Sequence, residues 1–191
     1  FLGSENNVLK RYYDANKKFK ADIIIRITGD SILIDYKLVD KVIDLFIKNR
    51  VDYASNSQPV SYPDGLDIEI FSKKCLRDTY RIAKNKYDKE HVTPLMRSLD
   101  KFKRINLKND KDYSFLRWTL DQKEDLKILE SIIKYFGTKR YFSWEQILKL
   151  TQSNKKKFNA NIKIIRNEGA KMSKTQKLWK RAKEIIPGGN M

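Results

Sequence analysis

Apolar residues recur along the chain with two spacings, which predict a succession of helices and strands. Helical spacing predicts helices over residues 8–19, 36–48, 73–85, 121–136 and 175–186, and a short helix that begins at Ser143. Short apolar or alternating runs predict strands over residues 23–27, 51–54, 66–71, 102–107 and 116–120. Residues 151–174 have no clear period, which indicates a surface crossover and linker. Because helix and strand alternate from the start, we predict an α/β fold with a parallel sheet layered by helices.

The loop after the first predicted strand carries the leading candidate for chemistry. The strand is a β-branched run, bounded as a buried strand should be, and it ends at Thr28 and Gly29, with Asp30 next. Ligands of open α/β sheets bind at the carboxyl ends of the strands, so Asp30 is a candidate metal or substrate contact. A Gly-Asp pair also makes an ordinary turn, and the spacing alone leaves both interpretations open.

A second predicted strand also delivers an aspartate at its end. Asp121 follows the strand over residues 116–120, and Glu124 comes three positions later, the spacing of a capping box with Asp121 as N-cap. Two carboxylates from neighbouring strands can also hold one Mg²⁺ ion, which takes few protein oxygens and leaves positions for phosphates. Asp121 therefore has a structural and a metal-binding interpretation.

Other polar candidates also have structural alternatives. Asp67 and Glu69 share the polar face of an alternating strand, which either lies in solvent or lines a cleft. The only histidine, His91, follows Glu90, a pattern more typical of a structural pair than of a general base. Cys75, the only cysteine, lies in a helical pattern, so we expect a buried thiol rather than a nucleophile, and no internal disulfide.

The distribution of charge limits the classes of partner. The formal net charge is +17, but lysines outnumber arginines 30 to 11, and 11 basic against 2 acidic residues fall in the last 41 positions. Scattered, lysine-dominated charge without a nucleic-acid motif argues against specific nucleic-acid binding. No apolar run approaches the roughly 20 residues of a membrane span, and no signal peptide is visible, so we expect no membrane partner and a cytoplasmic location.

Four separated motifs carry a resemblance to a known family. They are GSENNVLKRYYDANKKFKADIIIRITGDSILID, YPDGLDIEIF, YDKEHVTP and LRWTLDQKEDL, in this order between Gly3 and Ile165. Together they closely resemble cytidylyltransferases of the spore-coat polysaccharide type, relatives of the CMP-sialic acid and CMP-Kdo synthetases. The resemblance implies a Rossmann-like α/β/α sandwich of the nucleotide-sugar transferase type. It also implies transfer of CMP from CTP to a small anionic acceptor, such as a sugar acid or sugar phosphate, with release of pyrophosphate.

The resemblance also implies roles for individual residues. Asp30 and Asp121 take the places of the two catalytic Mg²⁺ ligands. The nucleotide-binding candidates are Arg11, Thr28 and Gly29. The candidates that face the acceptor are Asp67, Glu69, Glu90, His91, Arg117 and Thr119. The family's loop commonly has Cys-Pro where this chain has Ser31-Ile32, which is expected to loosen the turn after Asp30.

Both ends of the chain suggest a piece of a longer protein. Family members begin with a strand and a loop of the form QARxxSxRLPGK that holds the nucleotide, and this chain starts after it. We therefore expect residues 1–166 to form a cytidylyltransferase domain that lacks these parts, is inactive alone and has an exposed sheet edge or hydrophobic patch. Homodimer formation stays open. The tail QKLWKRAKEIIPGGNM resembles the opening of class III aminotransferases, so residues 167–191 are expected to lead into a domain whose PLP site lies downstream.

Two rival functions stay open at the level of sequence. In the first, the domain is a catalytically silent partner that docks the fused aminotransferase; this alternative stays open because no phosphate loop is visible in the sequence. Less favoured is a basic nucleic-acid-binding module that uses the lysine-rich tail.

Overall fold

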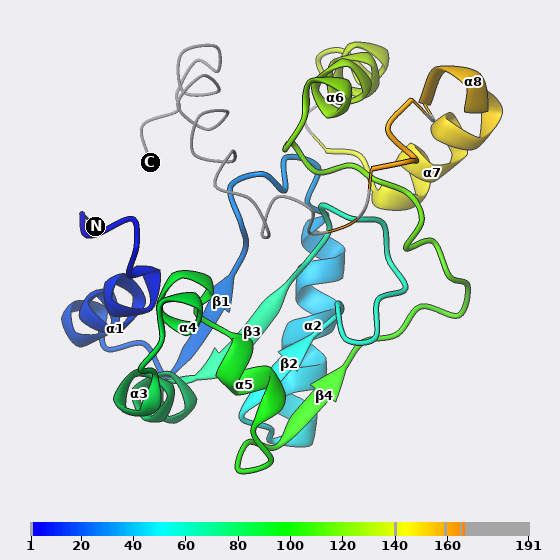
Figure 1. Cartoon of the computed structure of the whole chain (residues 1–191). Helices are drawn as coiled ribbons and strands as arrows, with labels where there is room; N and C mark the ends of the chain where they lie inside the picture. The colour runs from blue at the N-terminus through cyan, green and yellow to red at the C-terminus, as the bar shows by residue number, and fades with distance from the viewer. Residues whose placement is uncertain (1, 140, 159, 165, 167–191) are drawn as a thin grey trace. The chain divides into compact units, whose positions relative to one another are not determined.

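The computed structural model describes residues 2–139, 141–158, 160–164 and 166 (Figure 1). The chain forms two compact units that interleave along the sequence. Unit 1 comprises the described residues up to 27 together with 36–60 and 68–109; unit 2 comprises 28–35, 61–67 and the described residues beyond 109. The predicted aminotransferase-like segment, residues 167–191, lies outside the described residues.

Unit 1 contains a four-stranded mixed sheet. Its strands are β1 (Ile23–Arg26), β2 (Tyr53–Ser55), β3 (Glu69–Ser72) and β4 (Arg104–Asn106), in the order β1-β3-β2-β4. β3 is antiparallel to both β1 and β2, whereas β2 and β4 are parallel. The predicted all-parallel sheet is therefore wrong: β1, β2 and β4 share one direction, and β3 runs opposite, because the chain reverses in the turn-rich stretch between β2 and β3. The α/β class itself is confirmed.

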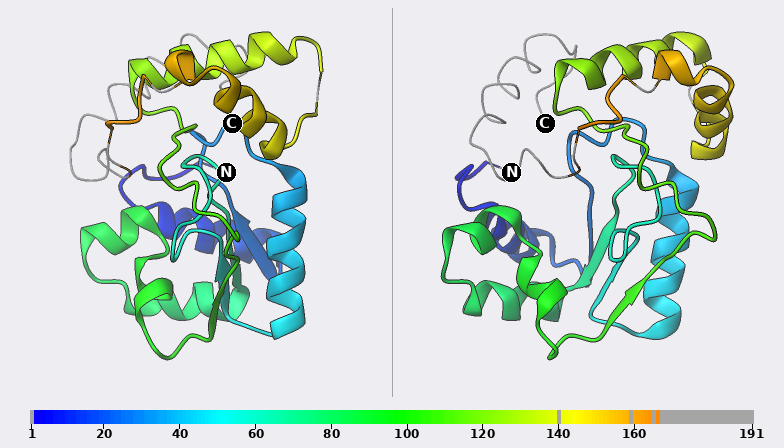
Figure 2. Two further views of the ribbon diagram at one scale, coloured as in Figure 1. Left: turned by 90° about the vertical axis from the view of Figure 1, so that its right-hand side faces the viewer. Right: turned by 45° about the vertical axis from the view of Figure 1, so that its right-hand side comes forward.

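Helices cover both faces of this sheet. The helix α2 (Tyr36–Asn49) lies on one face, and α1 (Val8–Phe19), α3 (Lys73–Ile82), α4 (Lys86–His91) and α5 (Pro94–Ser98) lie on the other (Figure 2). The predicted helices over residues 8–19 and 36–48 are confirmed, but the one predicted over 73–85 ends at Ile82. The bounds of α1 and α3 follow from local capping. Asn7 accepts a hydrogen bond of 3.1 Å from the Lys10 amide, and Ser72 accepts one of 3.0 Å from the Cys75 amide.

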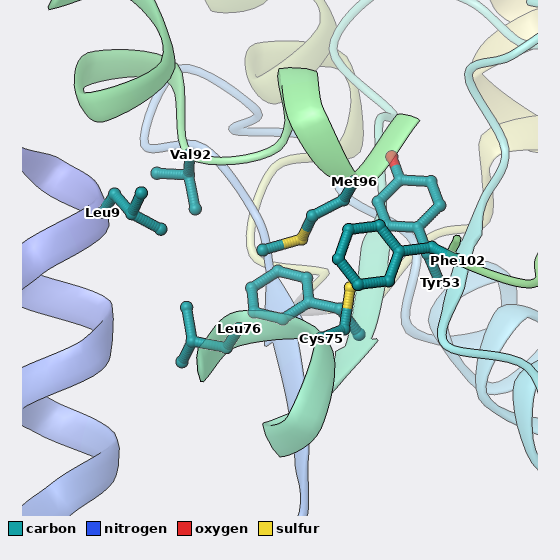
Figure 3. Close-up of a cluster of buried hydrophobic side chains, with 8 residues drawn as sticks. Leu9, Tyr53, Cys75, Leu76, Val92, Met96 and Phe102 are labelled. Carbon is teal, nitrogen blue, oxygen red and sulfur yellow. The ribbon is translucent and has the colours of Figure 1, made fainter. Parts of the chain in front are cut away.

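A hydrophobic core cluster of unit 1 lies between the sheet and the four-helix face (Figure 3). Its buried members are Leu9, Tyr53, Phe71, Cys75, Leu76, Val92, Met96 and Phe102. The Cys75 side chain is fully buried, and this burial is the main reason that the pKa of its thiol is raised to about 12. The expected buried thiol is thus confirmed, since a thiol of this pKa stays protonated and weakly nucleophilic.

β1 differs from the buried strand that its sequence predicts. It is an edge strand, and Ile23 and Ile25 are each 40% exposed. Only the alternate residue, Ile24, packs against the core, because the helix on the other face, α2, contacts β2, β3 and β4. The expected exposed, apolar sheet edge is therefore present at β1. The missing strand itself stays a prediction.

Unit 2 contains three further helices: α6 (Lys123–Phe136), α7 (Trp144–Ser153) and α8 (Lys155–Phe158). The strand predicted over residues 116–120 is not formed; this stretch is extended and makes a single parallel bridge, from Arg117 to Asp64. The N-cap of α6 is Gln122, with Asp125 at the third helical position, so the predicted Asp121 cap is displaced by one residue. Within the described residues no helix combines the length and apolarity needed to cross a membrane.

Candidate active site

Asp30 lies in a short loop of unit 2 that two turns shape. The Ser31 amide donates to the Thr28 carbonyl at 3.1 Å, and the hydroxyl groups of these two residues are also 3.1 Å apart. Gly29 lies at the exposed tip of the turn. The Asp30 Oδ1 atom is buried and has no hydrogen-bond partner in the described part of the chain. A buried carboxylate oxygen without a partner is costly, so this atom is suited to a ligand.

Asp121 lies beside this loop. The Leu120 amide donates a hydrogen bond of 3.1 Å to the Asp30 carbonyl, which ties the two segments together. Burial raises the pKa of the Asp121 carboxyl, and the neighbouring charge of Asp30 raises it further. The structure thus brings together two aspartates that are remote in sequence, although Asp121 does not end a strand as predicted.

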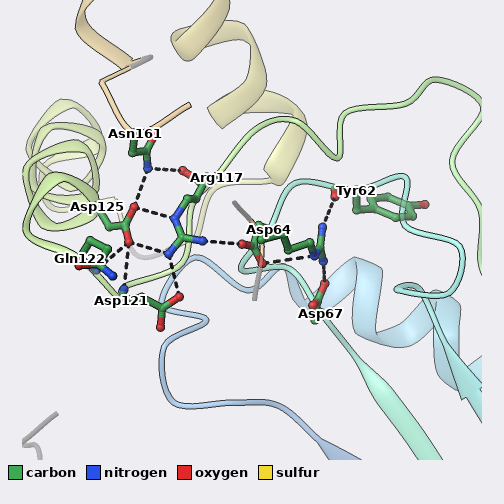
Figure 4. Close-up of polar contacts among 9 residues, drawn as sticks. Tyr62, Asp64, Asp67, Arg117, Asp121, Gln122, Asp125 and Asn161 are labelled. Atoms are coloured by element: carbon green, nitrogen blue, oxygen red, sulfur yellow. Dashed lines mark hydrogen bonds and ion pairs between the residues drawn. The ribbon is translucent and has the colours of Figure 1, made fainter. Parts of the chain in front are cut away.

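Arg117 is the centre of a buried hydrogen-bond network (Figure 4). Its Nε donates to Asp125 at 3.0 Å, and its Nη1 donates to Asp64 at 2.9 Å. Its Nη2 donates to Asp121 at 2.8 Å and to the second oxygen of Asp125 at 3.0 Å. The Arg117 side chain is only 5% exposed. A guanidinium group with three carboxylate partners fixes their positions, and here one of those partners is Asp121.

Asp125 completes the other side of this network. It is fully buried and accepts hydrogen bonds from the backbone amide of Gln122 at 2.9 Å and from the backbone amide of Asp121 at 3.0 Å. Asn161 donates to Asp125 at 2.7 Å and to the Arg117 carbonyl at 3.0 Å. Sequence reasoning missed both Asp125 and Asn161. Asp125 did have a sequence signal: it lies three positions after Gln122, so these two residues have capping-box spacing, as Asp121 and Glu124 do.

Arg166 connects a second pair of aspartates. Its guanidinium contacts Asp67 and lies 3.5 Å from Asp64, and it donates to the Tyr62 carbonyl at 3.3 Å. The interpretation of residues 151–174 as a surface crossover is wrong for Asn161, which is 2% exposed, and incomplete for Arg166. No periodic pattern marks these residues, because side-chain polar contacts hold them rather than the apolar face of a helix or strand.

Gly65 allows the two halves of the network to approach. Its φ is +94°, and a Cβ atom there would come within 2.6 Å of both the Thr119 nitrogen and the Trp118 carbonyl carbon. On either side, the Asp64 amide donates to the Leu116 carbonyl at 2.9 Å, and the Trp118 amide donates to the Asp64 carbonyl at 2.7 Å. The turn-rich Pro-Asp-Gly sequence therefore places Asp64 against Arg117.

The charges of this cluster are unbalanced. Two guanidinium groups face five carboxyl groups, those of Asp30, Asp64, Asp67, Asp121 and Asp125. Burial raises the pKa of the Asp64 carboxyl to about 6, against the lowering effect of Arg166 and Arg117. Because the arginine contacts fall on the other four aspartates, the uncompensated negative charge gathers at Asp30 and at the free side of Asp121.

A divalent cation fits this donor set. Two carboxylates, one with a buried oxygen that lacks a partner, suit Mg²⁺, which binds few protein oxygens and keeps water or phosphate ligands. Within the described residues there is no cluster of three or more His, Cys, Asp or Glu side chains that could hold a metal. A cation at Asp30 and Asp121 would therefore take its other ligands from a phosphate substrate or water.

The structure separates the two carboxylates of the alternating segment. Asp67 lies in unit 2 with Arg166, whereas Glu69 lies in β3 of unit 1. Glu69 is 4% exposed and accepts hydrogen bonds from Arg26 at 2.5 Å and the Tyr53 hydroxyl at 2.6 Å. The solvent-exposed interpretation is therefore wrong for Glu69, because the two neighbouring strands supply partners that the sequence pattern does not reveal.

The other predicted residues have simpler surroundings. His91, at the end of α4, packs its ring against Tyr87 with ring centroids 4.4 Å apart, and burial lowers the pKa of its imidazole. Glu90 beside it is partly buried. Thr119 is buried next to Gly65, and Arg11 lies on α1. Their predicted roles at the nucleotide and the acceptor stay predictions.

Comparison with known proteins decides the family. The family model described as cytidylyltransferase matches residues 1–164. The chain belongs to the cytidylyltransferase family. A solved structure of a cytidylyltransferase from Leptospira borgpetersenii serovar Hardjo-bovis is similar at a TM-score of 0.78 and 37% sequence identity. That similarity covers 83% of this chain and 67% of the Leptospira chain, and it confirms the Rossmann-like nucleotidyltransferase fold.

Two curated relatives extend the comparison. An uncharacterised protein of Methanocaldococcus jannaschii is 34% identical over 139 residues, which cover 71% of this chain and 56% of the relative. The spore coat polysaccharide biosynthesis protein SpsF of Bacillus subtilis is 28% identical over 158 residues, 81% of this chain and 65% of SpsF. The cytidylyltransferase chain thus spans between about half and two thirds of the length of these curated relatives.

Proposed function

We propose that the protein transfers CMP from CTP to a small anionic acceptor and releases pyrophosphate. The family match over residues 1–164 supports this reaction, and the juxtaposition of Asp30 and Asp121 is the structural observation that carries it. An oxygen of the acceptor attacks the α-phosphorus of CTP, and the bond from that phosphorus to the pyrophosphate oxygen breaks. Such a transfer needs positioning and charge stabilisation rather than a covalent protein intermediate.

Asp30 and Asp121 would hold Mg²⁺ for this reaction. When bound, the ion neutralises charge on the α-phosphate and orients the leaving pyrophosphate. The role of the chain is to keep the two carboxylates in place: the bond from the Leu120 amide to the Asp30 carbonyl fixes the backbone, and Arg117 holds one oxygen of Asp121. The PLP predicted for a downstream domain has no part in this step.

Arg117 would act through Asp121 rather than on the acceptor. The resemblance assigns it to the acceptor pocket, but its donors are directed to Asp64, Asp121 and Asp125, and its side chain is 5% exposed. These contacts support a positioning residue. Although burial opposes the charged form, the bonds with Asp125 and the surrounding carboxylates raise the pKa of Arg117.

One relative supports the proposed class of acceptor. The name of SpsF places that protein in spore coat polysaccharide biosynthesis, which supports a sugar acid or sugar phosphate as acceptor here and a role in surface polysaccharide formation. The comparisons favour neither a silent docking domain nor a nucleic-acid-binding module.

Pyrophosphate release by the full-length protein tests the proposal. Asp30→Asn and Asp121→Asn are each expected to reduce the CTP-dependent rate by several orders of magnitude, whereas Asp22→Asn, on a side chain 92% exposed, leaves it unchanged. Near-normal turnover by either of the first two variants would rule out the metal-binding role. Absence of turnover with every acidic sugar and CTP would favour the silent domain.

A further inference from the structure

A second polar site lies in unit 1 and shares no residue with the aspartate cluster of unit 2. It is a cavity of about 180 Å³, and Arg97 and Arg104 are among the residues that line it. The rest of the wall comes from β2, β4 and the loop after β2. It includes Ser55 of β2, Asn106 of β4 and Gln58 of the loop. A cavity of this volume is smaller than the roughly 300–1,000 Å³ of a drug-sized ligand site, so it fits one functional group with its nearest carbons.

The cavity follows β2 and β4 along their length, from their first residues, Tyr53 and Arg104, to their last, Ser55 and Asn106. Arg26 pairs with Glu69, Glu69 with Ser55, and Ser55 with Asn106, so one row of polar residues crosses all four strands. Arg26, Ser55 and Asn106 are the last residues of β1, β2 and β4, which run in the same direction. The row therefore marks the carboxyl ends of these three strands, the usual ligand edge of an α/β sheet.

Hydrogen bonds keep the wall of the cavity in one arrangement. The Oδ1 atom of Asn106 accepts hydrogen bonds from the Ser55 hydroxyl at 3.0 Å and from the backbone amide of Gln58 at 2.8 Å. The Nδ2 atom of Asn106 donates to the Pro59 carbonyl at 3.0 Å. Asn106 thus joins β2, β4 and the loop after β2. A wall built in this way is formed before any ligand arrives, which reduces the entropy lost on binding.

Arg97 carries the charge that this wall leaves without a partner. Arg104 donates to the Arg97 carbonyl and to Asp100 at 3.1 Å, so Arg104 is paired and also fixes the end of α5. Arg26 is paired with Glu69. The Arg97 guanidinium is half-buried and, among the described residues, makes neither a hydrogen bond nor an ion pair. A partly buried cation without a partner favours an anionic ligand.

We propose that this cavity binds the acidic group, a carboxylate or phosphate, of the small acceptor, and that Arg97 is its charged partner. The identification of the ligand as the acceptor rests on the proposed transferase function; the anion site itself rests on the cavity and on Arg97. Neither the motifs nor the relatives indicate Arg97 or this cavity.

Binding of simple probes to the full 191-residue chain tests the site. Glucuronate and glucose 6-phosphate separate the two acidic groups, inorganic phosphate reports the anion alone, and glucose is the neutral control. We expect saturable binding of at least one acidic sugar, and Arg97→Met is expected to weaken it about tenfold or more, because a charge-assisted hydrogen bond is lost. Arg97→Lys is expected to weaken it less, and Arg81→Met, at an exposed arginine of α3, not at all.

A second variant keeps the proposal testable if Arg97→Met does not fold. Gln58→Glu adds a carboxylate to the wall at an exposed position and is expected to weaken the acidic sugar and leave glucose unchanged. Equal affinity for glucose and glucuronate, or affinity that survives both substitutions, would overturn the proposal. Displacement of the acidic sugar by CTP alone would overturn the acceptor assignment, since the cavity would then take a nucleotide phosphate.

The transferase proposal and this site fail separately. Asp30→Asn is expected to abolish turnover and leave glucuronate binding intact. Loss of activity with intact Arg97-dependent binding therefore supports the anion site, even if the reaction is of another kind. Normal transferase kinetics in Arg97→Met, with an unchanged KM for the acceptor, would contradict the site and leave the transferase function standing.

Discussion

The backbone amide of Leu120 donates a hydrogen bond of 3.1 Å to the backbone carbonyl of Asp30. This single bond joins two segments of unit 2 that are remote in sequence, and it brings the Asp30 carboxylate into electrostatic contact with Asp121. Two buried or half-buried carboxylates that share a neighbourhood repel each other unless a cation or proton lies between them.

Removal of the Asp30 charge is expected to stabilise the metal-free protein. Asp30→Asn relieves the repulsion of Asp121, so the free energy of unfolding in EDTA rises, while the extra stability that Mg²⁺ gives the native protein is lost. Urea denaturation with and without Mg²⁺ measures both effects. Asp22→Asn, at an exposed carboxyl, is the matched control. A native-like response of Asp30→Asn to Mg²⁺ would contradict the predicted metal site.

Removal of the Arg117 guanidinium is expected to destabilise unit 2 strongly. Arg117→Met leaves Asp125 and Asp64 buried without their cation, and breaking a buried ion pair in this way costs about 3–5 kcal/mol. Arg77→Met removes an exposed arginine that faces Asp78 and is expected to cost less than about 1 kcal/mol. Chemical denaturation gives the comparison. A stable Arg117→Met protein with only a raised KM for the acceptor would instead favour direct acceptor contact.

The close approach at Gly65 is expected to tolerate no side chain. Gly65→Ala combines a positive φ with contacts of 2.6 Å to the backbone of Trp118 and Thr119, so we expect a loss of about 3 kcal/mol or more. Gly137 is the control, because its φ is also positive, at +58°, but no atom lies within 4 Å of an added Cβ. Gly137→Ala should therefore show the backbone strain alone, about 1–3 kcal/mol. Equal thermal shifts for the two variants would show that the Gly65 contact relaxes.

Asp64 is expected to make stability fall between about pH 4 and pH 6. Burial raises the pKa of its carboxyl from 3.8 to about 6, so in this window the folded protein keeps a proton that the unfolded chain releases. As pH rises through the window, this group lowers the free energy of unfolding by up to roughly 3 kcal/mol. Asp64→Asn should remove that component from the pH profile of urea denaturation. Parallel profiles for the native protein and Asp64→Asn would contradict the raised pKa.

Local patterns in the sequence predicted the longest helices and, by resemblance, the family. Helical spacing correctly predicted the two long helices over residues 8–19 and 36–48, because the apolar face of an amphipathic helix comes from regularly spaced residues of one segment. The motifs around Asp30 and Asp121 indicated the cytidylyltransferase fold by resemblance, and the family match and the Leptospira structure confirm that fold.

Which polar groups contact each other depends on the packing of segments that are remote in sequence. Asn161 and Arg166 follow no period, yet they contact Arg117 and Asp64, because a hydrogen bond requires two atoms to be close in space and requires no repeat in the sequence. Strand direction and the exposure of β1 were also decided by pairing across the sheet, which a local hydrophobic run does not encode. The unpaired guanidinium of Arg97 became visible for the same reason: a missing partner is a property of the folded neighbourhood.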